Sequence, residues 1–511
     1  EMPIGISAPT PQLPAGIPSG AVLQQDYSNL KGGLVFAAPH QRTTASTDAN
    51  NLGPRISLAY RINERTVLRT GYGLFYNPTL FGTAGAGQGG VAGFQEVTNW
   101  TTTLNSDGYT PWGRISDPWP NGVRVLTGNS LGARTWLGMG PSAPLRDRSA
   151  TAYTQTWSFG LQRELPGSIL VEGQYVGTKG TKLNWLSAGA INYLGPWIEQ
   201  ATESEISTLT APNVPNPFVG IITDPAVGMS GPTISASQLV QPFPQFGGVN
   251  AYNTPWANSI YHSFQLRVDK RLSKGLQFLV TYTNSKNIDD NSLSTWTGWL
   301  GGDQGGPTNP NNRRLDRSLS QYDISQIFQV VYIYQLPFGR GMRWGANWNP
   351  ALNALLGGWQ TNGIWRFDTG QPIQLYLQSG QALPTYGGQR PNLDAPLQVR
   401  EGTTDERLNA YFTNPEVATS PTRWTLGSAP RMLPNARVPG TNTALLSFFK
   451  EVPLSKLREG AKIQFRAEAF NALNHPQFGC LNTTVGQGNF GKMTCQTNSP
   501  REAQLALKLY W

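Results

Sequence analysis

The chain has 511 residues, of which 14% are charged and 11% are aromatic, and its formal net charge is +9. Charged residues are scarcer than the roughly 25% of typical soluble domains, and no apolar run reaches the roughly 18 residues of a membrane-spanning helix. The basic residues are dispersed along the sequence, which argues against nucleic acid as a partner, because nucleic-acid binding requires a concentrated basic surface.

Twelve segments show the two-residue alternation of apolar and polar side chains that is typical of β-strands. In "SIYHSFQLRVDKRL" (259–272) the apolar residues from Ile260 to Leu272 share one face. In "AKIQFRAEAF" (461–470) Phe465 and Arg466 lie on opposite faces. Two segments, 32–37 and 324–337, carry apolar residues on both faces. In chain order, the predicted strands are 32–37, 54–62, 66–76, 151–164, 168–177, 259–272, 276–286, 324–337, 357–369, 444–454, 461–471 and 501–511.

The connectors between these segments alternate between long and short. The short ones are 63–65, 165–167, 273–275, 455–460 and the somewhat longer 338–356. The long ones are 77–150, 178–258, 287–323, 370–443 and 472–500. Loops beyond roughly 15 residues are uncommon in compact soluble domains. Long loops at one end of the strands and tight turns at the other are typical of transmembrane β-barrels.

The sequence therefore predicts an all-β fold, an antiparallel transmembrane β-barrel with long extracellular loops and short periplasmic turns. Ten residues rising about 3.3 Å each and tilted by about 45° climb about 23 Å, close to the apolar band of about 25 Å in such barrels. The predicted location is the cell outer membrane, with its lipid around the barrel. Leu507, Leu509 and Trp511 of the terminal segment "REAQLALKLYW" share one face. This ending resembles the signal that the barrel assembly machinery recognises.

Several phrases resemble the Oar-like family of TonB-dependent outer-membrane transporters. They are "LGPRISLAYRINERTVLRTGYGLFYN" (52–77), "VTYTNSKNIDD" (280–290), "NNRRLDRSLSQYDISQIFQVVYIYQLPFGRG" (311–341), "LLGGWQTNGIWRFDTGQPI" (355–373), "FRAEAFNALNHPQFG" (465–479) and "QLALKLYW" (504–511). One departure is Ser325-Gln326, where the family commonly has a basic pair. The resemblance implies a barrel of about 22 strands around an N-terminal plug.

On this resemblance, residues 1–511 correspond to the C-terminal part of the barrel, with the plug and the N-terminal domain absent. An unpaired sheet edge is then expected near residues 32–62. The implied partners are the plug and the TonB complex. The implied function is to bind a substrate at the outer loops and pass it to the periplasm with TonB-coupled energy. The alternative is a passive porin or an adhesion-type barrel.

Candidate binding residues follow from the predicted faces and loops. Charged residues on the polar faces are expected to point into the lumen, toward the plug, water or a substrate: Arg267, Asp269, Arg271, Arg366, Asp368, Arg466 and Glu468. Loop tryptophans are candidates for stacking on an unidentified substrate, although they could equally pack the loops together: Trp112, Trp119, Trp296 and Trp299.

The sequence carries no catalytic constellation, and we predict neither an enzyme nor a cofactor or metal site. Asp289 and Asp290 in "IDDNS" lack the spacing of a calcium loop and indicate a solvated acidic loop instead. Cys480 and Cys495 have no further cysteines beside them for a metal site, so we expect a disulfide in an oxidising compartment, the alternative being two free buried thiols.

Overall fold

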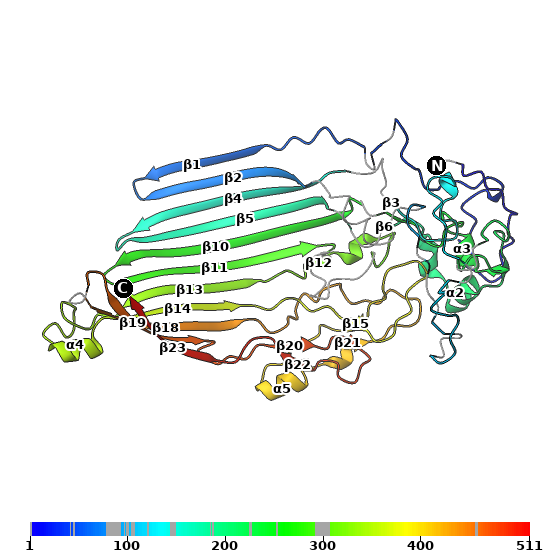
Figure 1. Cartoon of the computed structure of the whole chain (residues 1–511). Coiled ribbons are helices and arrows are strands. Elements are labelled where there is room, and N and C mark those ends of the chain that lie inside the picture. Colours follow the sequence, from blue (N-terminus) through cyan, green and yellow to red (C-terminus); the bar gives the residue numbers. More distant parts are fainter. Residues whose placement is uncertain are drawn as a thin grey trace.

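A computed structural model gives the fold of the chain (Figure 1). It describes all residues except 1–2, 41, 44–45, 78–92, 97, 99–101, 104–107, 120–121, 144–149, 184, 186–188, 224–226, 252–253, 292–306 and 455–457. The dominant element is one large sheet, whose strands lie side by side in chain order (Figure 1).

Eleven strands form the continuous path of this sheet, each antiparallel to the next. They are β1 (Arg55–Asn63), β2 (Thr66–Asn77), β4 (Ala152–Leu165), β5 (Ile169–Leu183), β10 (Ala257–Ser273), β11 (Leu276–Asp289), β13 (Gln326–Gln335), β14 (Trp359–Asp368), β18 (Asn442–Pro453), β19 (Lys462–Phe470) and β23 (Glu502–Tyr510). A two-residue strand, β12 (Ser318–Leu319), pairs with β11 beside this path. The predicted antiparallel all-β fold is confirmed.

The predicted strand at 32–37 is wrong, and the sheet begins at β1 instead. Residues 32–37 start with two glycines and carry apolar residues on both faces. A Cβ on Gly32 would lie 2.4 Å from the ring of Phe243, and one on Gly33 would lie 2.4 Å from the Ala133 carbonyl oxygen. The two glycines bring this segment close to other loops, and it forms no strand.

The two faces of the sheet differ in polarity across the middle of the strands. Directly opposed residues of an antiparallel pair share a face, so the register connects residues across many strands. One row is apolar apart from a glycine and runs through Leu161, Gly173, Leu266, Tyr282, Phe328 and Phe367. A row on the other side is entirely polar and runs through Gln162, Glu172, Arg267, Thr281, Gln329, Arg366 and Thr443. We call these sides the apolar face and the polar face.

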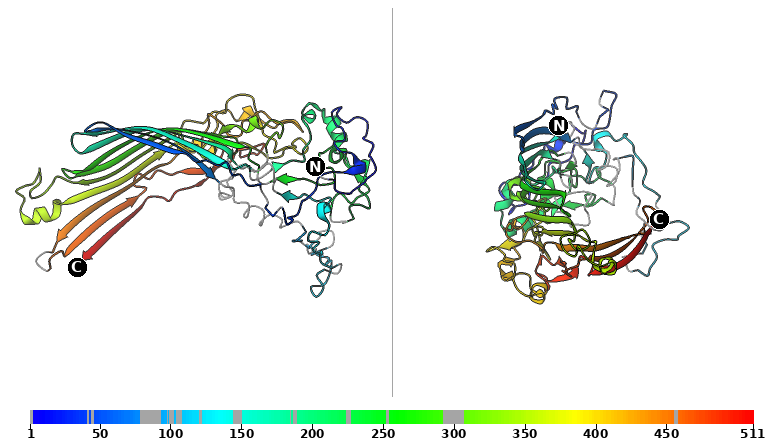
Figure 2. Two further views of the ribbon diagram at one scale, coloured as in Figure 1. Left: turned by 90° about the horizontal axis from the view of Figure 1, so that it is seen from above. Right: turned by 90° about the vertical axis from the view of Figure 1, so that its left-hand side faces the viewer.

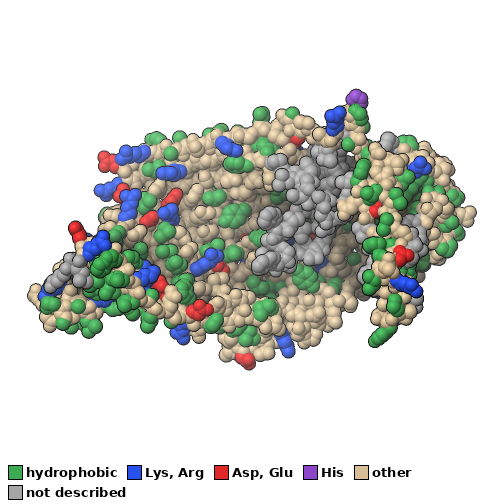
Figure 3. Space-filling view, viewed as in Figure 1, with side chains coloured by type: hydrophobic (Ala, Val, Ile, Leu, Met, Phe, Trp, Pro, Cys, Tyr) green, Lys and Arg blue, Asp and Glu red, His purple; other side chains and the backbone are tan. Residues whose placement is uncertain are grey.

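The sheet is curved like a trough, as the view along the strands in Figure 2 shows. Tight turns join the strands at one end, which we call the turn end, and the long connectors gather at the opposite end, the loop end (Figure 1). Figure 3 looks onto the hollowed side of the trough, where charged side chains are scattered among uncharged ones.

The connectors at the loop end are folded and contain short elements of their own. The α-helices here are α2 (Glu203–Thr210), α3 (Ala236–Leu239) and α5 (Thr404–Asn409). The 3-10 helices are η1 (Tyr27–Asn29), η3 (Gly132–Arg134), η5 (Pro196–Gln200), η6 (Arg313–Asp316) and η7 (Pro415–Val417). The short strands are β3 (Ser142–Ala143), β6 (Gly189–Ala190), β7 (Val214–Pro215), β8 (Thr233–Ile234), β9 (Asn250–Ala251), β15 (Tyr376–Leu377), β16 (Asn392–Leu393), β17 (Ala418–Thr419), β20 (Phe478–Leu481), β21 (Thr484–Val485) and β22 (Met493–Gln496).

Two hydrophobic cores hold these loops together. The first joins the N-terminal segment, through Ile4 and Tyr27, to the connector that contains α2 and α3. The second joins the connector before β18 to the connector before β23, through residues such as Phe412 and Val485. A further helix, α4 (Pro350–Leu356), lies at the turn end (Figure 1). Within the described residues, no helix is both long enough and apolar enough to cross a membrane.

Candidate functional site

The charged residues predicted for the lumen share the polar face of the sheet. Arg267 and Asp269 project from β10, Arg366 and Asp368 from β14, and Arg466 and Glu468 from β19. For Arg271 only the alternation places it on this face, because the register shifts between Lys270 and Ser273. Their roles toward a lumen, a plug or a substrate stay predictions.

Most of these charges are matched by partners on the same face. Arg267 Nη2 lies 2.9 Å from Asp269 Oδ2, and Arg366 Nε lies 2.8 Å from Asp368 Oδ2. Both pairs join residues two apart on one strand, which project to the same side. The polar face is therefore rich in hydrogen-bonding groups but carries little uncompensated charge along β10 and β14.

The partners on β19 are uncharged. Arg466 Nε donates to Gln464 Oε1 over 2.5 Å, and its guanidinium lies 4.8 Å from the centre of the Phe449 ring. Glu468 accepts a hydrogen bond of 2.7 Å from Gln504 Nε2. Both charged side chains, Arg466 and Glu468, thus form these hydrogen bonds with neutral amides.

A hollow of about 340 Å³ lies on the polar face at the turn end. Amide side chains, one carboxylate, Arg466 and the Phe449 ring contribute to its lining: Gln360, Asn362, Phe449, Glu451, Gln464 and Arg466. Leu336, Met342 and Trp359 complete the lining beside these side chains of the polar face. Such a lining suits hydrogen-bonding groups such as peptide amides and water.

The loop tryptophans divide into exposed and packed ones. Trp119 is exposed and Trp112 is half-buried, while Trp296 and Trp299 lie outside the described residues. Trp185 is buried, and Trp136 donates from Nε1 to Glu96 Oε1 over 3.1 Å. The described tryptophans thus include several that stabilise the loops, and Trp119 stays a candidate for substrate contact.

Three arginine–aspartate pairs at the loop end were not predicted. Arg390, Arg431 and Arg437 of the connector before β18 pair with Asp316, Asp289 and Asp323. Arg431 is 1% exposed and also donates through Nε to the Asp316 carbonyl oxygen over 2.9 Å. The pairs attach this connector to the segment between β11 and β13.

The prediction of a solvated acidic loop at Asp289 and Asp290 is therefore wrong. Asp289 is buried against Arg431. Asp290 accepts a hydrogen bond of 2.6 Å from the Asn258 amide nitrogen, yet burial raises the pKa of its carboxyl. Among the described residues, no group of three or more potential metal ligands is found. The partners of these aspartates, Arg431 and Asn258, lie far away in the sequence, so local reasoning missed them.

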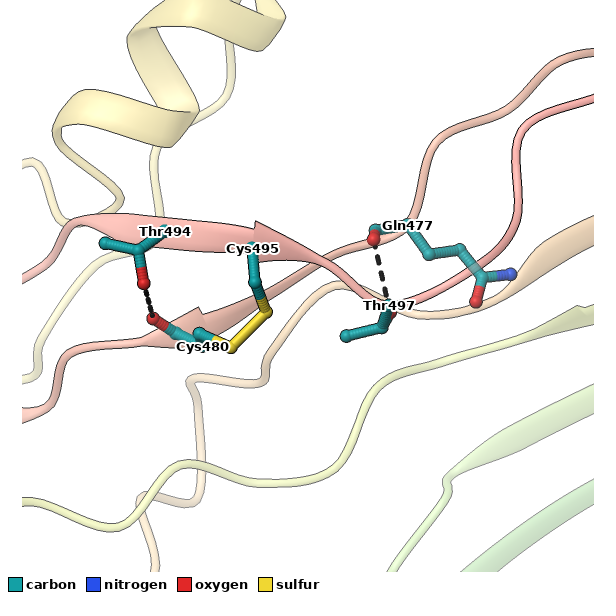
Figure 4. The surroundings of a disulfide bond; sticks show 5 residues. All are labelled: Gln477, Cys480, Thr494, Cys495 and Thr497. Atoms are coloured by element: carbon teal, nitrogen blue, oxygen red, sulfur yellow. Dashed lines mark hydrogen bonds between the residues drawn. A yellow bond between two sulfur atoms is a disulfide. The ribbon is translucent and has the colours of Figure 1, made fainter.

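The predicted disulfide between Cys480 and Cys495 is confirmed. It joins β20 and β22 in the connector before the last strand (Figure 4). Hydrogen bonds flank it on both sides, from Thr494 Oγ1 to the Cys480 carbonyl oxygen over 3.4 Å and from the Thr497 amide to the Gln477 carbonyl oxygen over 2.8 Å (Figure 4).

The terminal strand exposes its apolar side chains. β23 pairs with β19, and Leu507, Leu509 and Trp511 are all exposed. Leu507 and Leu509 lie on the apolar face opposite Phe465 and Ile463. Their role as an assembly signal stays a prediction.

Several solved structures are similar to the chain over most of its length. Solved structures similar to it include the outer membrane transporter YddB from Escherichia coli (9% identity, TM-score 0.39), the ferric-catecholate import receptor Fiu from K12 E. coli (9%, 0.36) and the FrpB iron transporter from Neisseria meningitidis (11%, 0.34). These matches cover 90%, 89% and 89% of this chain but only 40%, 34% and 39% of the solved chains. The chain thus spans less than half the length of these proteins.

A search of the curated proteins found no match. The sequence model of one family, however, matches residues 15–504, nearly the whole chain. The matched region includes the start of every strand of the sheet, the whole of the second loop core and most of the first. The curved antiparallel sheet, with one apolar and one polar face, is the architecture that such a family requires. The chain belongs to the outer membrane beta barrel domain family.

Proposed function

We propose that this chain forms part of the wall of an outer-membrane transporter that takes up a substrate with TonB-coupled energy. In this proposal the apolar face contacts lipid and the polar face lines the lumen. The loop end is extracellular and receives the substrate. Transport, not catalysis, is the activity, and the substrate is unidentified.

The observation that carries this proposal is the polarity of the two faces. A polar row crosses seven neighbouring strands, and apolar side chains cover the opposite side. In a membrane barrel the backbone groups are hydrogen-bonded between the strands, apolar side chains face the lipid, and polar side chains face the lumen. The resemblance to Oar-like transporters supports the coupling to TonB.

The polar face offers suitable contacts for a plug inside the lumen. Arg466 and Glu468 are charges of this face whose side-chain hydrogen bonds go to the neutral Gln464 and Gln504. The hollow beside Gln464 and Arg466 lies at the turn end, where amide-rich walls can bind the backbone of an inserted domain. Arg267, Asp269, Arg366 and Asp368 would mainly contact water, since they neutralise one another.

Conductance of the natural full-length protein in planar lipid bilayers tests the proposal. A transporter whose plug closes the lumen should conduct weakly at first and strongly after urea has released the plug. A passive porin would conduct strongly from the start, and that result would overturn the proposal. An adhesion-type barrel would stay closed in urea, which would also count against it.

A further inference from the structure

The connector between β13 and β14 differs from the other connections at the turn end. The strands β1 and β2, β4 and β5, and β10 and β11 are joined by tight turns. Residues 336–358 instead form a folded projection with α4, which extends beyond the ends of the strands (Figure 1). The sequence "PFGRGMRWGANWNPALNALLGG" (337–358) contains Trp, Leu and Arg but no acidic residue.

This projection is folded with its apolar side chains outward. α4 reads "PALNALL" and has no buried residue. Leu352, Leu355 and Leu356 are 37%, 68% and 47% exposed, and Trp344 is 49% exposed. A group of exposed apolar residues on one element marks an interaction site, since single exposed ones are normal but clusters are not.

The exposed group belongs to an ordered structure. Asn349 caps α4 by accepting a hydrogen bond of 2.7 Å from the Leu352 amide. Asn353 Oδ1 accepts one of 2.7 Å from the Arg340 amide. The rings of Phe338 and Trp344 stack with centroids 5.3 Å apart. The apolar side chains are therefore held outward by the fold and do not reflect an unfolded turn.

The projection is joined to the apolar face of the sheet. Trp359 Nε1 donates to the Leu355 carbonyl oxygen over 3.0 Å, and its ring meets that of Phe465 edge to face at 6.0 Å. Phe465 lies on the apolar face. On the same face, the Lys450 ammonium donates to the Gly357 carbonyl oxygen and lies 5.4 Å from the centre of the Trp359 ring. α4 thus continues the apolar face at its turn end.

The charge of the projection indicates what covers it. Arg340 and Arg343 are its only charged residues, and the guanidinium of Arg343 lies 5.2 Å from the centre of the Trp344 ring. Figure 3 shows basic, acidic and hydrophobic side chains together at this end of the molecule, while the projection itself contains no acidic residue. Helices that lie in a membrane surface follow a common pattern. Their leucines enter the acyl region, their tryptophans lie at the interface, and their arginines lie near the phosphates.

We propose that α4 and its connector lie in the headgroup region of the inner leaflet of the outer membrane, bound to glycerophospholipid. The three leucines enter the acyl boundary, and the two arginines contact lipid phosphates. Lipid is favoured over a protein partner because the patch is continuous with the apolar face and carries only positive charge. The projection would fix the height of the barrel wall in the membrane on this side.

A spin label on Leu355→Cys tests this proposal in the natural full-length protein, reconstituted into vesicles of phosphatidylethanolamine and phosphatidylglycerol. Cys480 and Cys495 are bonded to each other, so the introduced thiol is the only free one in this chain. Collision of the label with oxygen, which concentrates in lipid, is compared with collision with a water-soluble nickel complex. The matched control is Glu64→Cys, an exposed position in the tight turn between β1 and β2. Leu356→Cys is a second labelling position, and heat-modifiable gel mobility verifies that each variant is folded.

We expect the label at Leu355 to be reached by oxygen and shielded from nickel, at a depth of about 5–10 Å below the phosphates. The label at Glu64 should be reached by nickel. Equal nickel access at both positions would overturn the proposal. Shielding from both reagents would overturn it as well, because it would indicate that a protein covers α4.

Discussion

Two adjacent valines provide a matched test of the faces of the sheet. Val330 lies on the apolar face of β13, opposite Val280 and Trp365. Val331 lies on the polar face, opposite Leu279 and Ile364. The same substitution, to arginine, can thus be made at neighbouring positions of one strand. If the faces are assigned correctly, Val330→Arg places its charge in lipid and Val331→Arg places it in the lumen.

The expected cost follows from the depth of Val330. With a rise of about 3.3 Å and a tilt of about 45°, each residue climbs about 2.3 Å along the membrane normal. Val330 is four residues from Gln326 and five from Gln335, the two ends of β13. It therefore lies about 9 Å from one boundary and about 12 Å from the other, near the midplane. Arginine on the lipid face costs about 2–4 kcal/mol at that depth.

The test compares the free energy of unfolding of the two variants with that of the unchanged protein. It is measured by urea titration of the natural full-length protein in lipid vesicles. Val330→Arg should lower it by about 2–4 kcal/mol, and Val331→Arg by about 1 kcal/mol or less. Heat-modifiable gel mobility checks that each variant is folded before urea is added. A larger loss for Val331→Arg than for Val330→Arg would invert the faces and refute the assignment of apolar face to lipid.

Three further outcomes are expected at the loop end. Arg431→Met should destabilise the connector 370–441 by about 3–5 kcal/mol, because it leaves the buried Asp289 carboxylate unpaired. Amide hydrogen exchange should become faster in this connector, and unchanged protection of its amides would contradict the prediction. Peptide mapping without reductant should recover Cys480 bonded to Cys495, and reduction should cost up to about 3 kcal/mol for a loop of this length; two alkylated thiols in unreduced protein would contradict the pairing. Burial raises the pKa of Asp290 in the folded protein above its ordinary value of 3.8. The protonated carboxyl therefore contributes its full stabilisation to the folded protein below pH 3.8, and this contribution is lost as the pH rises through the folded pKa. Asp290→Asn should flatten this loss in unfolding curves measured at several pH values, and an unchanged profile would speak against it.

The strands could be predicted because their signal is local. Alternation in 276–286 required only neighbouring residues, and β11 covers residues 276–289. The disulfide could be predicted because the chain has two cysteines, both between the last two predicted strands. The prediction failed at 32–37, where Gly32 and Gly33 approach Phe243 and Ala133 of other loops closely. Such packing depends on residues that are distant in the sequence.

The loop end could not be predicted for the same reason. Asp289 looked like a solvated acid because its partner, Arg431, follows 142 residues later. The loop cores also join distant segments, as Ile4 with Phe218 or Phe412 with Val485. Loops without periodicity give no local indication of such contacts. The roles of the lumen charges and of Trp112 and Trp119 stay predictions, because they concern partners and not the fold.

The direction of the edge strands limits how the wall can close. Within the described residues the path ends at β1 and β23. The chain reverses its direction ten times from the first of these eleven strands to the last, so both edge strands run from the loop end to the turn end. Direct pairing of β1 with β23 would make one parallel pair in an otherwise antiparallel ring. A second copy related by rotation about the membrane normal would meet the first in parallel too. An all-antiparallel ring therefore requires an odd number of further strands between these two edges, which gives the even total usual in bacterial outer-membrane barrels.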